Sequence, residues 1–144
     1  MRALALDLGS KRVGIALSSG TLATPYEVLA RSGDRRRDHR AIAAHVAETG
    51  AEVVVVGLPL SLDGSVGHAA RRVLDECGQL AEVLDVPVET WDERLSTVTA
   101  ERSLDAQQLR GPARRRVVDK VAAAVILQAW LDARPAEHAA EEPS

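Results

Sequence analysis

Three acidic residues, far apart in the sequence, each occupy a position where a carboxylate can do chemistry. Asp7 lies near the end of an apolar segment, Glu93 follows an apolar segment that ends at Trp91, and Asp119 begins the last apolar segment. A carboxylate at the end of a buried strand is costly unless it is paired or bound to a metal ion. If the three converge, they suit Mg²⁺ or Mn²⁺ and the hydrolysis of a phosphodiester bond.

The same acids have a second interpretation that the residues leave open. Acids at strand ends and helix starts also cap backbone groups, and Asp7 would then cap the turn at Gly9. Asp92 and Glu93 are adjacent, so their side chains point in different directions and only one of them can face Asp7. We therefore take Asp7, Glu93 and Asp119 as a candidate catalytic and metal-binding set.

Basic residues gather in clusters, although the net charge of the chain is −3. Local clusters can attract a polyanion in an acidic protein, and each cluster taken alone is equally well explained as solvated surface arginines. Gly111 and Pro112 are expected to end a helix, which predicts a mobile basic segment at 114–116 beside Asp119. The clusters are Lys11 and Arg12; Arg35, Arg36, Arg37 and Arg40; and Arg114, Arg115 and Arg116.

A glycine-containing loop at 57–70, GLPLSLDGSVGHAA, leads from an apolar segment into a helix. Gly64, Ser65 and Gly67 could expose backbone N–H groups at the helix N-terminus, where phosphate binds readily. A simple turn with a helix cap at Ser65 is equally compatible with these residues. Ser65 is therefore a candidate nucleic-acid-binding residue rather than an assigned one.

The elements that must position these residues follow from the apolar patterns. Alternating or continuous apolar runs predict five strands, and helical periodicity predicts four helices. The first two strands form a hairpin, the run of four valines from Val53 is a central strand, and the order predicts a mixed α/β sheet with helices on both faces. The predicted strands are 2–8, 13–18, 24–29, 53–56 and 86–91, and the predicted helices are 38–49, 66–84, 97–109 and one from 118 onward.

Composition narrows the class of protein. With 144 residues the chain fits one domain, which we place at 1–134, followed by an acidic and disordered tail at 135–144. With one tyrosine and two tryptophans, base stacking on aromatic side chains cannot be the main way of binding nucleic acid. The lone Cys77 fits an apolar helix stripe, and the four histidines lack zinc-site spacing and are typical of surface or cap positions. Neither a membrane span nor a signal peptide is evident, which predicts a cytoplasmic protein.

Four sequence motifs, in order from about Leu4 to Leu131, resemble those of the YqgF/RuvX family. Members of this family are proposed to be pre-16S rRNA nucleases and are related to the RuvC Holliday junction resolvases. In this chain, DLGSKRVGIALS resembles the opening motif of the family, and GLPLSLDGSVGHAA resembles its central loop. The third motif is similar to DERLSTVTAE, and the last helix to VVDKVAAAVILQAWLD.

The resemblance implies an RNase H-like fold and a nuclease that depends on Mg²⁺ or Mn²⁺. Asp7, Glu93 and Asp119 match the family's acidic metal-binding positions, and Glu93 is preferred over Asp92. Lys11, Arg12 and Arg94 match basic positions that meet phosphate. Ser19 departs from the motif, which often continues with an acid there, and with three matched acids instead of four a second metal ion stays open.

Other functions stay open at this stage. The substrate is precursor rRNA or branched DNA, and the chain acts as a monomer or a weak homodimer. An actin-like ATPase is an alternative because DLGSKRVG resembles the phosphate loop of that class, but those enzymes need two such domains. The glycine spacing from Gly9 to Gly14 resembles a Walker loop, but Ile15 and Ala16 follow instead of Lys and Ser or Thr. A ribosome-assembly or transcription factor that is not catalytic is a further alternative.

Overall fold

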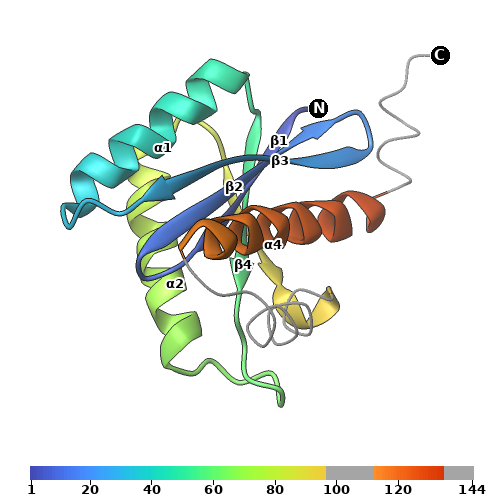
Figure 1. The fold of residues 1–144 in the computed structure, drawn as a ribbon. Coiled ribbons are helices and arrows are strands. Elements are labelled where there is room, and N and C mark those ends of the chain that lie inside the picture. Colours follow the sequence, from blue (N-terminus) through green and yellow to red (C-terminus); the bar gives the residue numbers. More distant parts are fainter. Residues whose placement is uncertain (97–111, 135–144) are drawn as a thin grey trace.

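A five-stranded mixed sheet forms the centre of the protein in the computed structural model (Figure 1). The structure describes residues 1–96 and 112–134, without the side chains of 112–118 and 120. The strand order is β3-β2-β1-β4-β5, with antiparallel pairs β3-β2 and β2-β1 and parallel pairs β1-β4 and β4-β5. This confirms the predicted mixed sheet. The strands are β1 (Ala3–Leu8), β2 (Arg12–Ser19), β3 (Leu22–Ala30), β4 (Val53–Leu58) and β5 (Val88–Asp92).

The hairpin of β1 and β2 is confirmed and brings Asp7 to the edge of the turn. Asp7 lies opposite Gly14 in the register, and the Gly9 N–H donates to the Arg12 carbonyl at 2.9 Å to close the turn. Strand β4 is buried along its whole length, as its valine run predicts. The middle strand is nevertheless β1 and not β4, because the hairpin and β3 add two strands on one side of β1.

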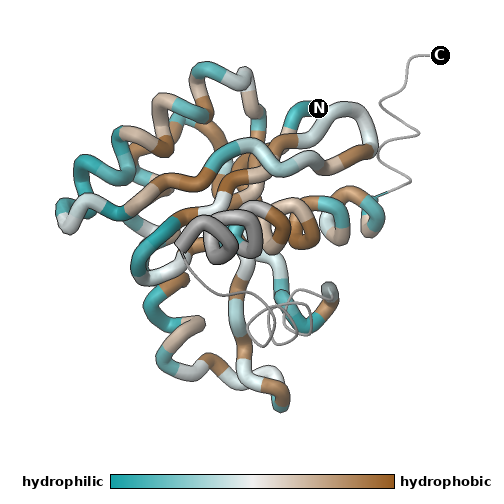
Figure 2. The backbone as a smooth tube through the Cα atoms, in the orientation of Figure 1, coloured by the Kyte–Doolittle hydropathy of each residue, from teal (hydrophilic) through white to brown (hydrophobic). Residues whose placement is uncertain are grey.

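Helices cover both faces of the sheet, as predicted (Figure 1). On β1, Leu4 and Leu6 pack in the core beneath α1 and α2, whereas the small Ala3 and Ala5 pack beneath α4. The small side chains let α4 lie close to the sheet. Figure 2 shows the hydrophobic residues along the strands and the inner sides of the helices. The helices are α1 (Arg35–Thr49), α2 (His68–Val83), a 3₁₀ turn η1 (Glu93–Leu95) and α4 (Pro112–Asp132).

Two helices begin earlier than the sequence patterns predict. Asp34 caps α1 by accepting from the Arg37 N–H at 3.2 Å, so the helix begins at Arg35 instead of residue 38. Helix α4 begins at Pro112, a residue suited to a first helical position, instead of residue 118. The arginines at 114–116 therefore belong to α4, and the expected mobile segment there is wrong. The predicted helix 97–109 and the tail 135–144 lie outside the described residues.

Two further predictions concern single buried residues. Cys77 is buried as predicted, and burial, with a smaller effect from Glu76, raises the pKa of its thiol to about 11. His39 is 3% exposed, so its prediction as a surface or cap residue is wrong.

None of the helices in the described ranges has the length and apolar character to cross a membrane.

Candidate active site

The three candidate acids line one pocket of about 310 Å³ at the carboxyl ends of β1, β4 and β5. Asp7 is the second-last residue of β1, Glu93 follows β5 in the turn η1, and Asp119 belongs to α4. Asp7 and Glu93 are buried, at 5% and 4% exposure. Parallel strands put their carboxyl ends at the same edge of a sheet, which explains how residues 86 positions apart come together.

Two glycines inside strands make room for this arrangement. A Cβ atom at Gly14 would lie 2.2 Å from the Asp119 carbonyl oxygen, so the backbone of α4 rests directly on β2. A Cβ atom at Gly57 would lie 2.5 Å from Ile126 Cδ1 and 3.1 Å from Glu93 Oε2. The sequence analysis missed both roles, although a glycine inside a strand is the signal for a close backbone approach.

The Asp119 carboxylate is bound by the guanidinium of Arg12. Arg12 Nε donates to Asp119 Oδ2 at 2.8 Å, and both side chains are about one-fifth exposed. Among the described residues, no three His, Cys, Asp or Glu side chains lie close enough together to hold a metal ion. The three acids thus line one pocket but are not arranged as the ligands of a metal ion. Their chemistry does fit, because carboxylate oxygens are the ligands that Mg²⁺ and Mn²⁺ prefer.

Asp92 and Glu93 face different surroundings, as their adjacency predicts. Asp92 accepts from the Arg94 side chain at 2.7 Å and from its backbone N–H at 2.9 Å, and these hydrogen bonds hold the pKa of Asp92 below its usual value. Glu93 lines the pocket, and Asp92 does not. Arg94 also donates to the Leu62 carbonyl at 3.3 Å, which links the end of β5 to the central loop.

The remaining candidate residues divide into those at the pocket and those away from it. Lys11 and Arg12 line the pocket from the β1-β2 turn. Ser65 does not line it; its hydroxyl and N–H both donate to Asp63, and Gly67 occupies the N-cap position of α2. Ser65 thus belongs to a turn with Asp63 and does not cap α2. The side chains of Arg114, Arg115 and Arg116 lie outside the description.

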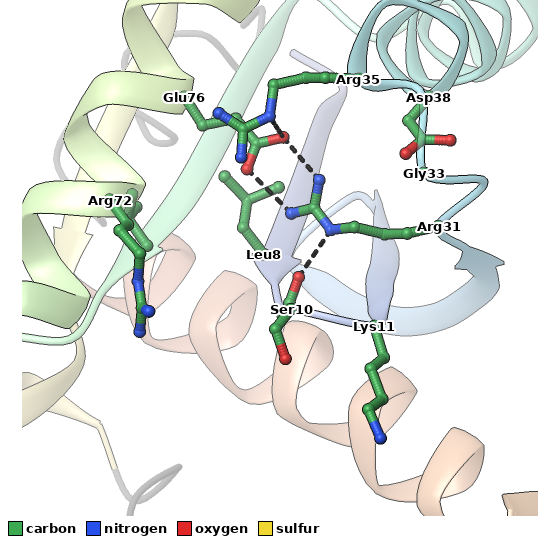
Figure 3. A pocket seen from close by; sticks show the side chains of 11 residues that line it. Leu8, Ser10, Lys11, Arg31, Gly33, Arg35, Asp38, Arg72 and Glu76 are labelled. Carbon is green, nitrogen blue, oxygen red and sulfur yellow. Dashed lines mark hydrogen bonds and ion pairs between the residues drawn. The ribbon is translucent and has the colours of Figure 1, made fainter.

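A buried ionic network that the sequence analysis missed fixes the β1-β2 turn (Figure 3). Arg31 donates to both carboxylate oxygens of Glu76 at 2.8 Å and, through Nε, to the Gly9 carbonyl at 2.7 Å. The Arg31 N–H donates to the Lys11 carbonyl at 2.9 Å. His39 Nε2 lies 2.7 Å from Glu76 Oε2. The network joins β3, α1 and α2 to the turn that carries Lys11 and Arg12.

The charges of this network support one another. Burial raises the pKa of Glu76, but hydrogen bonds from Arg31 and His39, with the charges of Arg31 and Arg35, outweigh it and lower that pKa. The hydrogen bond to Glu76 raises the pKa of Arg31. The sequence did contain a signal for a buried acid, because Glu76 lies on the apolar stripe of α2, next to Cys77 and three positions after Val73.

Comparison with known proteins places the chain in a family. A profile of the RuvX family, described as Holliday junction resolvase, matches residues 1–133. A protein from Kineococcus radiotolerans named "Putative pre-16S rRNA nuclease" is 48% identical over 94% of this chain and 74% of its own length. A protein of the same name from Desulforamulus reducens is 41% identical over 92% of this chain and 97% of its own length.

Solved structures agree on the fold. RuvC from Thermus thermophilus, solved in complex with a Holliday junction substrate, has a TM-score of 0.57 at 16% identity, covering 93% of this chain and 95% of its own. At that identity the likeness shows the fold, which is RNase H-like. Profile, relatives and fold agree, and the chain belongs to the RuvX family.

Proposed function

We propose that the chain is a metal-dependent nuclease that hydrolyses phosphodiester bonds in precursor 16S rRNA. The observation that carries the proposal is the single pocket that the buried Asp7 and Glu93 line together with Asp119, Lys11 and Arg12. Buried carboxylates beside basic side chains suit a cation and a phosphate together. The domain is 1–134, and the function implies a cytoplasmic protein.

The acidic residues are proposed to bind the metal ion and the basic residues to bind the substrate phosphates. Asp7, Glu93 and Asp119 would hold Mg²⁺ or Mn²⁺, and bound there the ion supplies an activated water and stabilises the leaving oxygen. Asp119 must first give up its hydrogen bond from Arg12. Arg12 is then available, together with Lys11, to bind phosphate oxygens of the substrate. Arg94 orders the end of β5 next to Glu93. Arg114, Arg115 and Arg116, which precede Asp119 in the sequence, are proposed as further contacts to the nucleic acid.

Precursor 16S rRNA is proposed as the substrate because the relatives of this chain are named for it. Relatives at 41% and 48% identity carry the pre-16S rRNA nuclease name, whereas the junction-bound RuvC is 16% identical. A resolvase makes two symmetric cuts and ordinarily works as a dimer, whereas trimming an rRNA end needs one cut. A monomer or weak homodimer fits the second task. The family description nevertheless makes resolution of branched DNA the second candidate function.

The test compares three substrates and two variants. Purified protein with Mg²⁺ or Mn²⁺ is given precursor rRNA, unstructured single-stranded RNA and a four-way DNA junction, and cleavage of the precursor is expected to be fastest. Asp7→Asn is expected to abolish cleavage and to remove the rise in melting temperature caused by Mn²⁺, because it removes a charged ligand. Asp75→Asn, an exposed aspartate on α2, is the matched control and should keep both.

Three outcomes would contradict the proposal in different ways. Full activity of Asp7→Asn would exclude the metal role, and a large loss of its thermal stability without metal would favour a capping role. Symmetric cleavage of junctions by a purified dimer would favour the resolvase. RNA binding without cleavage in any metal, with normal rRNA ends after depletion of the protein from its native cell, would favour a factor that is not catalytic.

A further inference from the structure

A second pocket, of about 510 Å³, adjoins the acidic one. The two pockets share the β1-β2 turn and Val73, and the second extends from there between the N-terminal part of α1 and α2. In Figure 3 the side chains of Arg72 and Lys11 extend to the same side of this pocket, with Ser10 between them. Arg72 was not singled out in the sequence analysis, and Arg35 was named there only as a member of a basic cluster.

The charges that line this second pocket leave it positive. Four cationic and two acidic side chains line it, and both acids are already engaged. Glu76 binds Arg31 and His39, and Asp38 accepts from the Ser32 hydroxyl at 2.7 Å and its N–H at 3.0 Å. The cations are Lys11, Arg31, Arg35 and Arg72.

Within the described part of the chain, Lys11 and Arg72 have no acidic partner. Arg35 reaches Glu76 only at 3.9 Å, and Arg31 is the cation that neutralises that carboxylate. The two unpaired cations come from different elements, the turn and α2, and Arg31 and Glu76 tie those elements together. The bonds therefore hold the turn and α2 together, so that the exposed side chains of Lys11 and Arg72 start from connected elements beside one pocket.

We propose that this second pocket binds a backbone phosphate of the nucleic-acid strand whose neighbouring phosphate lies in the acidic pocket. Arg72 and Lys11 contact the phosphate oxygens, and Arg35 adds charge at the rim. Positive side chains without acidic partners, extending from elements that a buried network holds together, are suited to phosphate, and contacts to phosphate position a strand without reading its sequence. This inference rests on the proposed function, because it takes nucleic acid as the ligand.

The test uses charge-matched variants on the same two helices. Arg72→Gln and the double variant Arg35→Gln with Arg72→Gln remove charge from the second pocket. Arg71→Gln and the double variant Arg37→Gln with Arg71→Gln remove the same charge from exposed neighbours that do not line it. Binding of single-stranded RNA is measured by fluorescence anisotropy over a series of salt concentrations, with EDTA present so that no cleavage occurs.

Arg72→Gln is expected to weaken binding several-fold at low salt. It should also reduce the slope of log affinity against log salt by about 0.7 for the lost phosphate contact, and the double variant should reduce it further. The Arg71→Gln and Arg37→Gln controls should keep the slope of the unaltered protein. Equal losses in pocket variants and controls would show a general surface effect and overturn the second pocket, as would an unchanged slope in Arg72→Gln.

The readout separates this inference from the proposed function. Cleavage is not measured, so a protein that binds RNA without cutting it would contradict the nuclease while the comparison of Arg72 with Arg71 still decides the second pocket. If the unaltered chain binds neither RNA nor a DNA junction, both proposals are wrong.

Discussion

Arg12 competes with any cation that enters the acidic pocket for the carboxylate of Asp119. Their hydrogen bond of 2.8 Å neutralises the one candidate ligand that comes from α4 rather than from the sheet edge. A metal ion must displace the guanidinium to gain that ligand. Arg12 also lines the pocket, so the displaced guanidinium would remain beside an arriving phosphate.

Replacing Arg12 should therefore change metal and RNA affinity in opposite directions. Arg12→Gln is expected to raise the affinity for Mn²⁺ by about fivefold, because a partly exposed ion pair contributes about 1 kcal/mol. It should lower RNA affinity in EDTA. Mn²⁺ titration followed by calorimetry, and anisotropy for RNA, measure the two effects, with Arg71→Gln as control. Weaker Mn²⁺ binding in Arg12→Gln would mean that Arg12 positions Asp119 instead of competing for its ligand.

At the scale of elements, the contact between β2 and α4 sets the position of Asp119. This contact depends on Gly14, where any side chain would meet the α4 backbone. Backbone cannot rotate away as a flexible side chain does, so α4 itself would have to shift.

Gly14→Ala should therefore be destabilising and inactive. Overpacking costs about 1–3 kcal/mol, and the shift of α4 should remove cleavage even where the fold survives. Gly78→Ala is the control, since its added Cβ meets nothing within 4 Å on α2 and should stabilise the helix by about 0.5–1 kcal/mol. Urea unfolding and cleavage assays check both. A Gly14→Ala protein with normal stability and activity would show that α4 is not held against β2.

The network of Arg31, His39 and Glu76 should make stability sensitive to acid. The pKa of Glu76 is lowered in the folded protein, so its contribution is fully present above the pKa of an unfolded glutamate, about 4.3, and is lost as pH falls through the lower folded value. Glu76→Gln should cost about 3 kcal/mol near pH 7, because it leaves Arg31 without its carboxylate.

The difference in unfolding free energy between Glu76→Gln and the unaltered protein should shrink as pH falls below about 4.3, the range in which Glu76 takes up a proton. Urea unfolding at a series of pH values measures this. Asp75→Asn, which changes the exposed neighbour on α2, should parallel the unaltered protein. A constant difference at all pH values would show that Glu76 is not the titrating group.

At the scale of the whole molecule, basic side chains gather around the site in a chain whose net charge is −3. The two adjoining pockets contain Lys11, Arg12, Arg31, Arg35 and Arg72. A third hollow between α1 and α2 is lined by Arg35, Arg36 and Arg40. The basic clusters seen in the sequence around Arg12 and Arg35 thus adjoin one another in the fold.

The third sequence cluster should contribute to the same surface. Arg115 precedes Asp119 by four residues in α4, about one helical turn. Replacing Arg114, Arg115 and Arg116 with Ala should weaken RNA binding and flatten its salt dependence by about 0.7 to 0.9 of a unit per lost phosphate contact. An identical slope in the triple variant, measured by anisotropy, would show that these arginines do not meet the bound strand.

The sequence by itself determined the five strands and the strand ends at which Asp7 and Glu93 lie. The Gly9 turn and the alternation of Leu4 and Leu6 with alanines specify the hairpin, and the valines of β4 specify a strand buried on both faces. These are local signals, because strand alternation, helix period and turn chemistry act over a few residues. They suffice to place Asp7 and Glu93 at the carboxyl ends of strands.

Only the tertiary structure decided what those residues meet. The pairing of Arg12 with Asp119 joins positions 107 apart, and the bonds from Arg31 to Glu76 and Gly9 join three elements. Such partners depend on how α2 and α4 pack on the sheet, and no local pattern records that packing. The start of α4 at Pro112 also differed from the pattern, because the apolar stripe that signals the helix begins a turn and a half after its first residue.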